Sequence, residues 1–341
     1  MSLTPREIPT GAVRYNTDSN KMEVYIGSTW MEVAVSTPNL DGGARGFAIG
    51  GNTQPAGVDD KIDFINIASA GNAQDFGDMV SGLFAGAGLS SRTRAVVSGG
   101  RQTPSTTSDI QYLTMSSTGG TIDWGVNPLN SLSYGSGAVS NQTRGITMGG
   151  YNTSNTKLTD IQFLTIASLG TINDFGNISA TRGYISSVNS PTRGLCNAGT
   201  EPAQVNTIEF ITIASTGDAQ DFGDLTVNGY RSGGCMSSTR GLIAFGETPS
   251  GDGQKNIDFV TIATLGNATN FGDLTVGGQH PVGTSDSVRG VWLGRQNQSP
   301  YTDNEVIDYV NIATQGDAVD FGNLVAGTSM PASASTGHGG L

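Results

Sequence analysis

Residues that could support catalysis are few in this chain. Its 341 residues include only two histidines, His280 and His338, and the second lies in a glycine-rich tail. Catalytic triads and most zinc sites need histidine beside an acid, a nucleophile or further ligands. An adjacent carboxylate pair such as Asp59 and Asp60 is typical of a solvated loop rather than of a glycosidase or calcium site. The sequence therefore predicts no catalytic residue, no bound metal and no cofactor, and a protein that is not an enzyme.

Two glycine-containing motifs suggest other chemistry at first sight. The Asp-Phe-Gly triplet begins at Asp75, Asp174, Asp221 and Asp320. No kinase catalytic loop or glycine-rich loop accompanies it, so its recurrence favours a turn whose aromatic residue packs between repeats. The Gly-Gly pairs at Gly50, Gly99 and Gly149 are not followed by a helix, which argues against a phosphate-binding loop. Most carboxylates lie in these repeated segments, where we expect them to cap turns and to be solvated.

Six arginines recur along the chain, each at the start of a short run of small or apolar residues. They are separated by 49, 50, 49, 47 and 49 residues, and they are Arg45, Arg94, Arg144, Arg193, Arg240 and Arg289. One interpretation is that they bind an anionic ligand together. The interpretation that we favour is structural, with each arginine tying its repeat to a neighbour through a carboxylate or a carbonyl.

A longer segment repeats with the same period. Residues Ile208–Thr226 read IEFITIASTGDAQDFGDLT, and near-copies begin at Ile62, Ile110, Ile161, Ile257 and Ile307. A period near fifty residues is typical of propeller blades that contain four strands each. The order within a repeat is a Ser/Gly-rich strand, the arginine strand, a β-branched and aromatic strand, and the strand with Asp-Phe-Gly. This order resembles the kelch blade.

The two ends of the chain differ from the repeats. Repeat one lacks its Ser/Gly strand, and Gly327–Gly340 has the composition of that strand, so we expect the C-terminal segment to complete the first blade. Near the N-terminus, Val13–Tyr15, Met22–Ile26 and Trp30–Val33 read as short strands. The predicted fold is all-β, with a small N-terminal β-meander at residues 1–35, a linker at 36–43, and a six-bladed kelch-like β-propeller at 44–341.

Composition excludes several classes of partner. The net charge is -12 at pH 7, whereas nucleic-acid binding needs a basic surface. Residues 1–30 carry no secretory signal pattern, and no stretch approaches the ~18 apolar residues of a membrane span. Cys196 and Cys235 have no metal or redox spacing and are expected to be buried thiols. We expect synthesis in the cytoplasm, with no membrane insertion and no nucleic-acid partner.

The loops that follow the arginine strands vary in length and composition between repeats. In an antiparallel blade these loops emerge on one face, and insertions on one face are the usual place for binding. Tyr151, Arg295 and Tyr301 have the greatest contact potential there and are the candidate ligand-binding or receptor-binding residues. The alternative is that these loops only tolerate variation and bind nothing.

The segment GAVRYNTDSNKMEVYIGSTWMEV, Gly11–Val33, resembles a segment of tail fibres and related appendages of tailed bacteriophages. The resemblance lies in residues that include Arg14, Tyr15, Glu23, Tyr25 and Trp30, while Met22 replaces the usual aromatic residue. The repeats resemble those of virion structural proteins from marine and cyanobacterial phages, so the two resemblances span nearly the whole chain. They imply a virion component that assembles as a homotrimer through its N-terminal part, with other virion proteins as partners.

Three hypotheses of function follow. The first is a phage appendage such as a tail fibre, whose N-terminal module docks on the particle and whose propeller meets a glycan or protein of the host surface. The second is a capsid or neck decoration protein with no receptor role. The third, a glycan-acting propeller enzyme, would need a cluster of acids or a metal site that the sequence does not offer.

Overall fold

A computed structural model describes residues 9–16, 21–32, 44–54, 57–103, 105–127, 129, 134–168, 170–200, 202–298 and 300–341. Within these ranges the protein is all-β and contains no helix, so no helix is long and apolar enough to cross a membrane. The chain divides into two compact units, residues 1–43 and 44–341, and each is described here by itself. The linker predicted at 36–43 lies outside the described residues.

The first unit is a three-stranded antiparallel sheet. Its strands are β1 (Val13–Asn16), β2 (Lys21–Ile26) and β3 (Thr29–Glu32), in the order β1-β2-β3. The pairing of Val13 with Val24 and of Val24 with Met31 places alternate residues of all three strands on one face.

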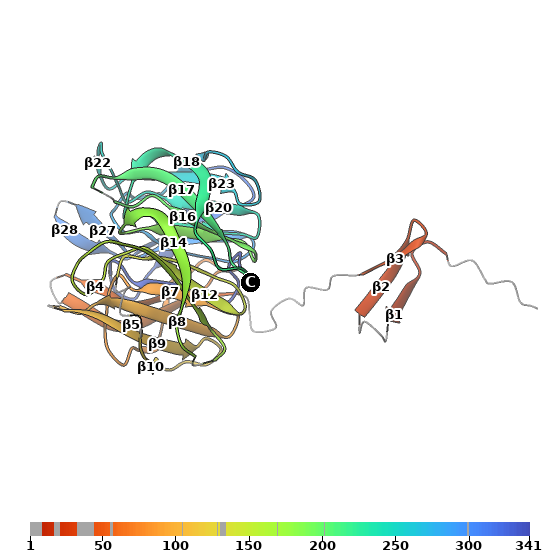
Figure 1. The fold of residues 1–341 in the computed structure, drawn as a ribbon, viewed down its shortest axis with the longest axis horizontal. Coiled ribbons are helices and arrows are strands. Elements are labelled where there is room, and N and C mark those ends of the chain that lie inside the picture. Colours follow the sequence, from red (N-terminus) through yellow and green to blue (C-terminus); the bar gives the residue numbers. More distant parts are fainter. Residues whose placement is uncertain are drawn as a thin grey trace, which may run out of the picture. The chain divides into compact units, whose positions relative to one another are not determined.

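The second unit contains six four-stranded antiparallel sheets among its described residues, which is consistent with propeller blades (Figure 1). We number them sheets 1 to 6 and give the strands in hydrogen-bonded order. Sheet 1 is β31 (Ala332–Ser335), β4 (Arg45–Thr53), β5 (Gly57–Asn66) and β6 (Gln74–Asp78). Sheet 2 is β7 (Ala87–Ser90), β8 (Arg94–Arg101), β9 (Thr106–Thr114) and β10 (Ile122–Val126). Sheet 3 is β11 (Gly137–Ser140), β12 (Arg144–Met148), β13 (Leu158–Thr165) and β14 (Asn173–Arg182).

The remaining sheets follow the same order. Sheet 4 is β15 (Ser186–Asn189), β16 (Arg193–Asn197), β17 (Val205–Thr212) and β18 (Gln220–Gly229). Sheet 5 is β19 (Gly233–Met236), β20 (Arg240–Ala244), β23 (Asn256–Thr261) and β24 (Thr269–Asp273). Sheet 6 is β25 (Val282–Ser285), β26 (Arg289–Leu293), β29 (Val306–Asn311) and β30 (Val319–Asn323).

Sheet 1 joins two distant parts of the chain. Strand β31 pairs with β4 through the register Ala332 to Ile49 and Ser335 to Gly46. The Ser/Gly strand that repeat one lacks is therefore supplied by the C-terminal segment, as the sequence pattern predicts. The pairing satisfies the backbone groups on one side of β4, which would otherwise form an open edge.

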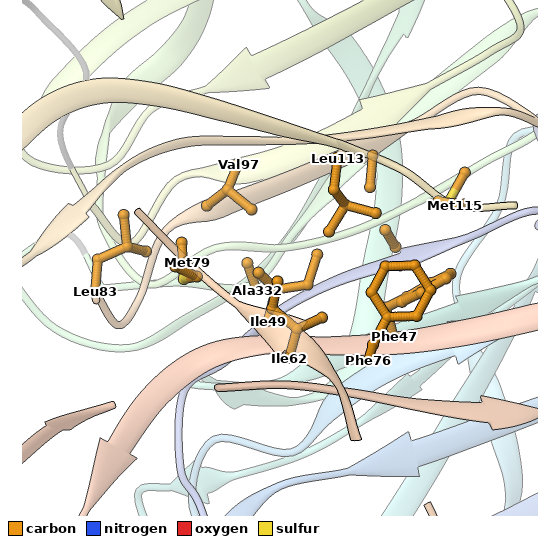
Figure 2. Packing of buried hydrophobic residues seen from close by; sticks show 12 residues of the cluster. Phe47, Ile49, Ile62, Phe76, Met79, Leu83, Val97, Leu113, Met115 and Ala332 are labelled. Atoms are coloured by element: carbon orange, nitrogen blue, oxygen red, sulfur yellow. The ribbon is translucent and has the colours of Figure 1, made fainter. Parts of the chain in front are cut away.

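The core lies between neighbouring sheets rather than within any one of them. In Figure 2, Phe47, Ile49 and Phe76 of sheet 1 face Val97 and Leu113 of sheet 2. Equivalent clusters join sheets 2 and 3, 3 and 4, 4 and 5, and 5 and 6. A further cluster joins sheet 6 to sheet 1, with Val291 and Leu293 packed near Ile65. Each sheet is thus covered on both faces, which explains the uninterrupted burial of arginine strands such as β12.

The Asp-Phe-Gly triplet lies in the fourth strand of its repeat, as the predicted strand order has it, and its aromatic residue packs between sheets as predicted; only the turn expected at the triplet is wrong. In sheet 4, Ile208 pairs with Gly223 and Glu209 with Asp221, so Phe222 lies in a β-bulge. The bulge turns Phe222 into the core between sheets 4 and 5. Gly223 has φ of +146°, and a Cβ there would lie 2.6 Å from the carbonyl oxygen of Gly266 in sheet 5. Only glycine allows this close approach between neighbouring sheets.

We call the end of the sheets that carries the six arginines the arginine end, and the opposite end, where the arginine strands finish, the loop end. At the loop end, β4 and β5 run on into a long hairpin, as do β8 and β9. Two further hairpins are β21 (Glu247–Thr248) with β22 (Gly251–Asp252), and β27 (Arg295–Gln298) with β28 (Tyr301–Asn304). Figure 1 shows both hairpins on the side of the unit away from the C-terminus.

Candidate ligand-binding site

Each of the six repeated arginines donates a hydrogen bond from Nη1 to a backbone carbonyl of the next sheet. The acceptors, in chain order of the arginines, belong to Met115, Ile166, Ile213, Ile262, Ile312 and Ile67. The last of these contacts runs from Arg289 of sheet 6 to sheet 1. Each guanidinium also lies 4.5–5.3 Å from the centroid of the aromatic ring on the adjacent strand. The arginines therefore link neighbouring sheets through hydrogen bonds to backbone carbonyl oxygens.

A second repeated contact involves the polar residue that follows the first isoleucine of the long repeat. This position is buried, and it is occupied by Asp63, Gln111, Gln162, Glu209, Asp258 and Asp308. Each side chain bonds the segment that enters from the preceding sheet; Asp258, for example, accepts hydrogen bonds from the backbone N and the hydroxyl of Thr226, both at 2.8 Å. The expectation that the repeated carboxylates lie in solvated turns is wrong at this position. Burial raises the pKa of Asp63 and of Asp258.

One backbone position at the loop end is repeated in conformation but not in residue type. It lies two residues before each innermost strand, and its φ is 53–63° in all six sheets. The residues there are Ala85, Gly135, Tyr184, Arg231, His280 and Met330. Together they line a cavity of about 100 Å³. Because φ is similar in each case, the residue type at this position varies without a change in φ.

The bulky members of this set stand beside a tyrosine cluster. Tyr151 stacks on Tyr134 with ring centroids 4.7 Å apart and planes 6° apart. The rings of Tyr184 and Tyr151 have centroids 5.5 Å apart and planes inclined by 62°. The rings of Tyr184 and Tyr230 have centroids 6.3 Å apart and planes inclined by 63°. His280 also packs against Tyr184, with ring centroids 5.6 Å apart. Inclined contacts of this kind hold the rings in fixed orientations.

Three of these tyrosines form part of the wall of a recess of about 560 Å³. We define the tyrosine recess by its lining residues, which are Tyr151, Lys157, Tyr184, Thr200, Pro202, Ala203, Gln204, Asn228, Tyr230, Arg231 and Pro249. These residues belong to sheets 3, 4 and 5 and to the loops at their loop end. The volume falls within the range of ligand pockets, and the lining combines aromatic faces with several hydrogen-bonding groups.

Arg231 is held in place by both aromatic and polar neighbours. Its guanidinium lies 4.9 Å from the ring centroid of Tyr230 and 5.4 Å from that of Tyr184. Nη1 donates to Glu247 at 3.1 Å and to Gln279 at 3.0 Å. Glu247 therefore neutralises Arg231 within the wall of the recess.

Burial affects the titration of two groups at this site. It raises the pKa of Tyr151 to about 12, and the neighbouring phenols of Tyr184 and Tyr134 add to the effect. Tyr151 is therefore a neutral phenol that can donate a hydrogen bond at physiological pH. Burial, followed by the charge of Arg231, holds the pKa of His280 well below its usual value, so His280 is a neutral packing residue.

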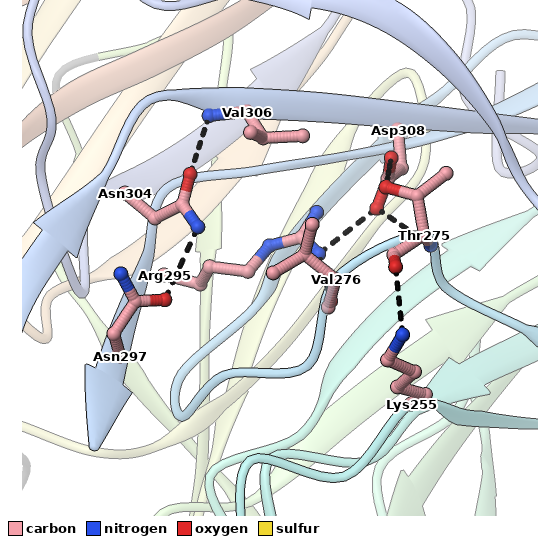
Figure 3. Close-up of polar contacts among 8 residues, drawn as sticks. All are labelled: Lys255, Thr275, Val276, Arg295, Asn297, Asn304, Val306 and Asp308. Carbon is pink, nitrogen blue, oxygen red and sulfur yellow. Dashed lines mark hydrogen bonds and ion pairs between the residues drawn. The ribbon is translucent and has the colours of Figure 1, made fainter. Parts of the chain in front are cut away.

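The three loop residues predicted to bind a ligand have different environments. Tyr151 lines the tyrosine recess. Tyr301 is 64% exposed on the hairpin of β27 and β28. Arg295 is fully buried, and its Nη1 bonds Asp308 at 2.9 Å and the carbonyl of Val276 at 2.6 Å (Figure 3). The prediction for Arg295 as a surface binding residue is wrong, because its charge is used to pair the buried Asp308.

The residues named for the attachment module divide between the two faces of the small sheet. Arg14 binds Glu23 at 2.7 Å, and its guanidinium lies 4.2 Å from the ring centroid of Trp30. Trp30 in turn packs against Tyr25, with ring centroids 5.3 Å apart. Hydrogen bonds from Asn16 and Arg14 lower the pKa of Glu23.

Tyr15 lies on the opposite face, which is apolar. We define the apolar face as Val13, Tyr15, Met22, Val24, Ile26 and Met31. Five of these side chains are 41–58% exposed, and Val24 is half-buried. The small sheet thus has one face joined by polar and aromatic contacts and one apolar face that is largely exposed among the described residues of its unit.

The remaining reactive residues are buried and dispersed. Cys196 and Cys235 are free buried thiols in different sheets, and burial raises the pKa of Cys235. His338 is buried beside the hydroxyl of Ser140. Over the described ranges, no three histidine, cysteine or carboxylate side chains are placed to hold a metal ion.

Sequence reasoning missed most of the tyrosine recess. Tyr184, Tyr230 and Arg231 lie just before the Ser/Gly strands, whose composition suggests a structural role only. An alignment of the repeats on those strands would have revealed Tyr184 and Arg231, because their position holds alanine or glycine in two other sheets.

Comparison with known proteins gives no family. No protein-family model matches the chain, and no curated protein matches it.

Proposed function

We propose that the chain is a phage virion appendage, such as a tail fibre, that binds its target through a closed six-bladed kelch-like propeller. The pairing of β31 with β4 supports closure of the propeller. So do the hydrogen bond from Arg289 to Ile67 and the cluster between sheets 6 and 1, which continue the contacts made by every other pair of neighbouring sheets. A closed propeller leaves the loop end of the sheets as a rigid display surface.

The observation that carries the proposal is the apolar face of the N-terminal sheet. Three short strands do not bury enough surface to be stable alone, and this sheet leaves the apolar side chains of Val13, Tyr15 and Met31 about half exposed. It therefore requires a partner. In the proposed function, three copies of the chain associate through these faces and attach to other virion proteins, so that the propellers are displayed toward a glycan or protein of the host surface.

Light scattering tests the assembly step. The full-length protein is compared with a chain that starts at Asp41, which retains all of the second unit. We expect a trimer for the full-length protein and a monomer for the shorter chain. A monomer in both cases would contradict the trimeric appendage and would favour a decoration protein that docks on a site provided by the particle.

The substitution of Met31 by Lys sharpens this test. Met31 belongs to the apolar face and is 53% exposed in its own unit, so a charge there should prevent association while leaving the melting of the second unit unchanged. Glu23→Gln is the matched control, because Glu23 lies on the other face beside Arg14. Loss of the trimer in both variants would show only that the sheet had unfolded, and it would remove support for the apolar face as the interface.

A further inference from the structure

We infer that the tyrosine recess is a saccharide-binding site, with a pyranose ring packed on Tyr184 and Tyr230. The inference rests on the proposed function, since it names the class of ligand that the displayed face takes. It also names the site, which combines Tyr151 with residues of sheets 4 and 5.

The aromatic faces provide the first argument. A pyranose presents one apolar C–H face and a periphery of hydroxyl groups, and tyrosine offers an apolar ring beside a polar hydroxyl. Tyr184 and Tyr230 are inclined to each other by 63°, so they form two walls against which a sugar can pack rather than a slot for a planar group. The volume of about 560 Å³ suits a ligand of one or two sugar units.

The hydrogen-bonding groups provide the second argument. Among the described residues, the hydroxyls of Tyr151 and Tyr184 and the Nη2 atom of Arg231 have no hydrogen-bond partner, and all three are donors. Gln204 contributes a buried Oε1 that also lacks a partner within the described part of the chain. A hydroxyl of the ligand can both accept from the first group and donate to the amide oxygen.

The charge balance decides against an anionic ligand such as a nucleotide. Arg231 is already paired with Glu247, and the protein as a whole is strongly acidic. An arginine in the recess wall whose charge is paired with a carboxylate favours a neutral, hydroxyl-rich group over a phosphate.

The test uses saturation-transfer difference NMR on the full-length protein. The probes are the methyl pyranosides of glucose, galactose, mannose and N-acetylglucosamine, with ribose 5-phosphate as an anionic comparison. We expect signals from the C–H face of at least one pyranoside and none from the phosphate. Binding of the phosphate alone, or of no pyranoside, would overturn the inference.

Two variants locate the binding. Tyr184→Gly removes one wall at a left-handed position where sheet 3 already has Gly135, so the backbone accepts the change. We expect it to weaken the affinity for the bound pyranoside at least tenfold. Gln204→Met removes an acceptor that has no partner in the described fold, so it should weaken binding without lowering the melting temperature.

Two controls lie on the same end of the molecule. Met330→Gly changes the equivalent left-handed position of sheet 1, which is not part of the recess, and Tyr301→Ala removes an exposed tyrosine elsewhere. Both should bind the pyranoside as the wild-type protein does. Equal loss in Met330→Gly and Tyr184→Gly would overturn the assignment to the recess.

The outcomes separate this inference from the proposed function. A monomeric protein that still binds a pyranoside would remove the trimeric appendage and leave the saccharide site in place. A trimer that binds no pyranoside would remove the saccharide site and leave the trimeric appendage in place.

Discussion

The arginine end and the loop end of the sheets differ in how strictly they repeat. At the arginine end, six arginines make the same carbonyl contact between neighbouring sheets. At the loop end, one left-handed backbone position is kept in every sheet while its residue varies from Gly135 to Tyr184. The comparison teaches that repetition of residue type marks a structural contact, whereas repetition of backbone alone leaves the side chain open to selection for binding.

Removal of residues 327–341 should have the largest effect. It deletes β31 and leaves β4 as an open edge, and it removes Ala332 and Ala334 from the cluster between sheets 1 and 2. We expect calorimetry to show a broad, non-cooperative transition in place of a single peak. Removal of residues 1–43 is the control and should leave the main transition intact. A chain without residues 327–341 that melts like the full-length protein would contradict closure through β31.

His338 predicts a pH dependence at the arginine end. Burial lowers its pKa from 6.5 to about 4. Between these values the unfolded chain binds a proton that the folded chain does not, so the stabilisation present above about pH 6.5 is lost as the pH falls to about 4. The shift corresponds to about 3 kcal/mol.

The measurement is the free energy of unfolding from denaturant titrations across that pH range. The slope of this free energy against pH should be smaller in His338→Gln than in the wild-type protein, by an amount that corresponds to up to one bound proton. Because the buried His280 has a lowered pKa as well, the comparison is made between the two proteins and not on the wild type alone. Identical slopes would contradict the burial of a neutral imidazole at position 338.

Substitution of one arginine should have an intermediate effect. Arg94 donates to the carbonyls of Ile166 and Ala167 at 2.7 and 3.0 Å, so Arg94→Ala leaves both oxygens without this partner. We expect a loss of roughly 2 kcal/mol in denaturant unfolding and no change in ligand binding. The control is Arg92→Ala two residues earlier, where the side chain is exposed. Equal losses in the two variants would mean that the inter-sheet contact contributes nothing.

Tyr301→Ala at the loop end should have the smallest effect. The side chain is 64% exposed on a hairpin outside the six sheets, so the free energy of unfolding should change by less than ~0.5 kcal/mol. Thermal melting measures this directly. A loss comparable to that of Arg94→Ala would show that the loop end also carries stability, and the contrast between the two ends would fail.

The sequence predicts the parts of this structure that depend on repetition. The strand order within a repeat and the completion of sheet 1 by β31 follow from residue patterns that occur several times. The partner of each arginine could not be predicted, because carbonyl oxygens carry no sequence signal. The buried role of Asp258 was missed for a related reason, since a carboxylate followed by an aromatic strand also fits a solvated turn.

The site is less predictable than the fold. Tyr151, Tyr184 and Tyr230 come from separate repeats, and only the stacking of neighbouring sheets brings them together. Arg295 shows a different error, because its position in the sequence predicts exposure and the residue is buried. A charged residue in a variable loop suggests exposure, but Arg295 is buried and paired with the carboxylate of Asp308 on β29.

The pairing of β31 with β4 cannot form until residues 332–335 have been synthesised. The hydrogen bond that joins Arg45 to Thr336 spans 291 residues. At roughly 5–20 residues per second, a ribosome needs about 15–60 s to make the chain between them. During that interval the nascent chain carries an unpaired strand, while the small N-terminal sheet has already emerged and is free to meet other copies. The association of N-terminal sheets that we propose can thus begin on the polysome before sheet 1 is complete, and the pairing of β31 with β4 then completes sheet 1.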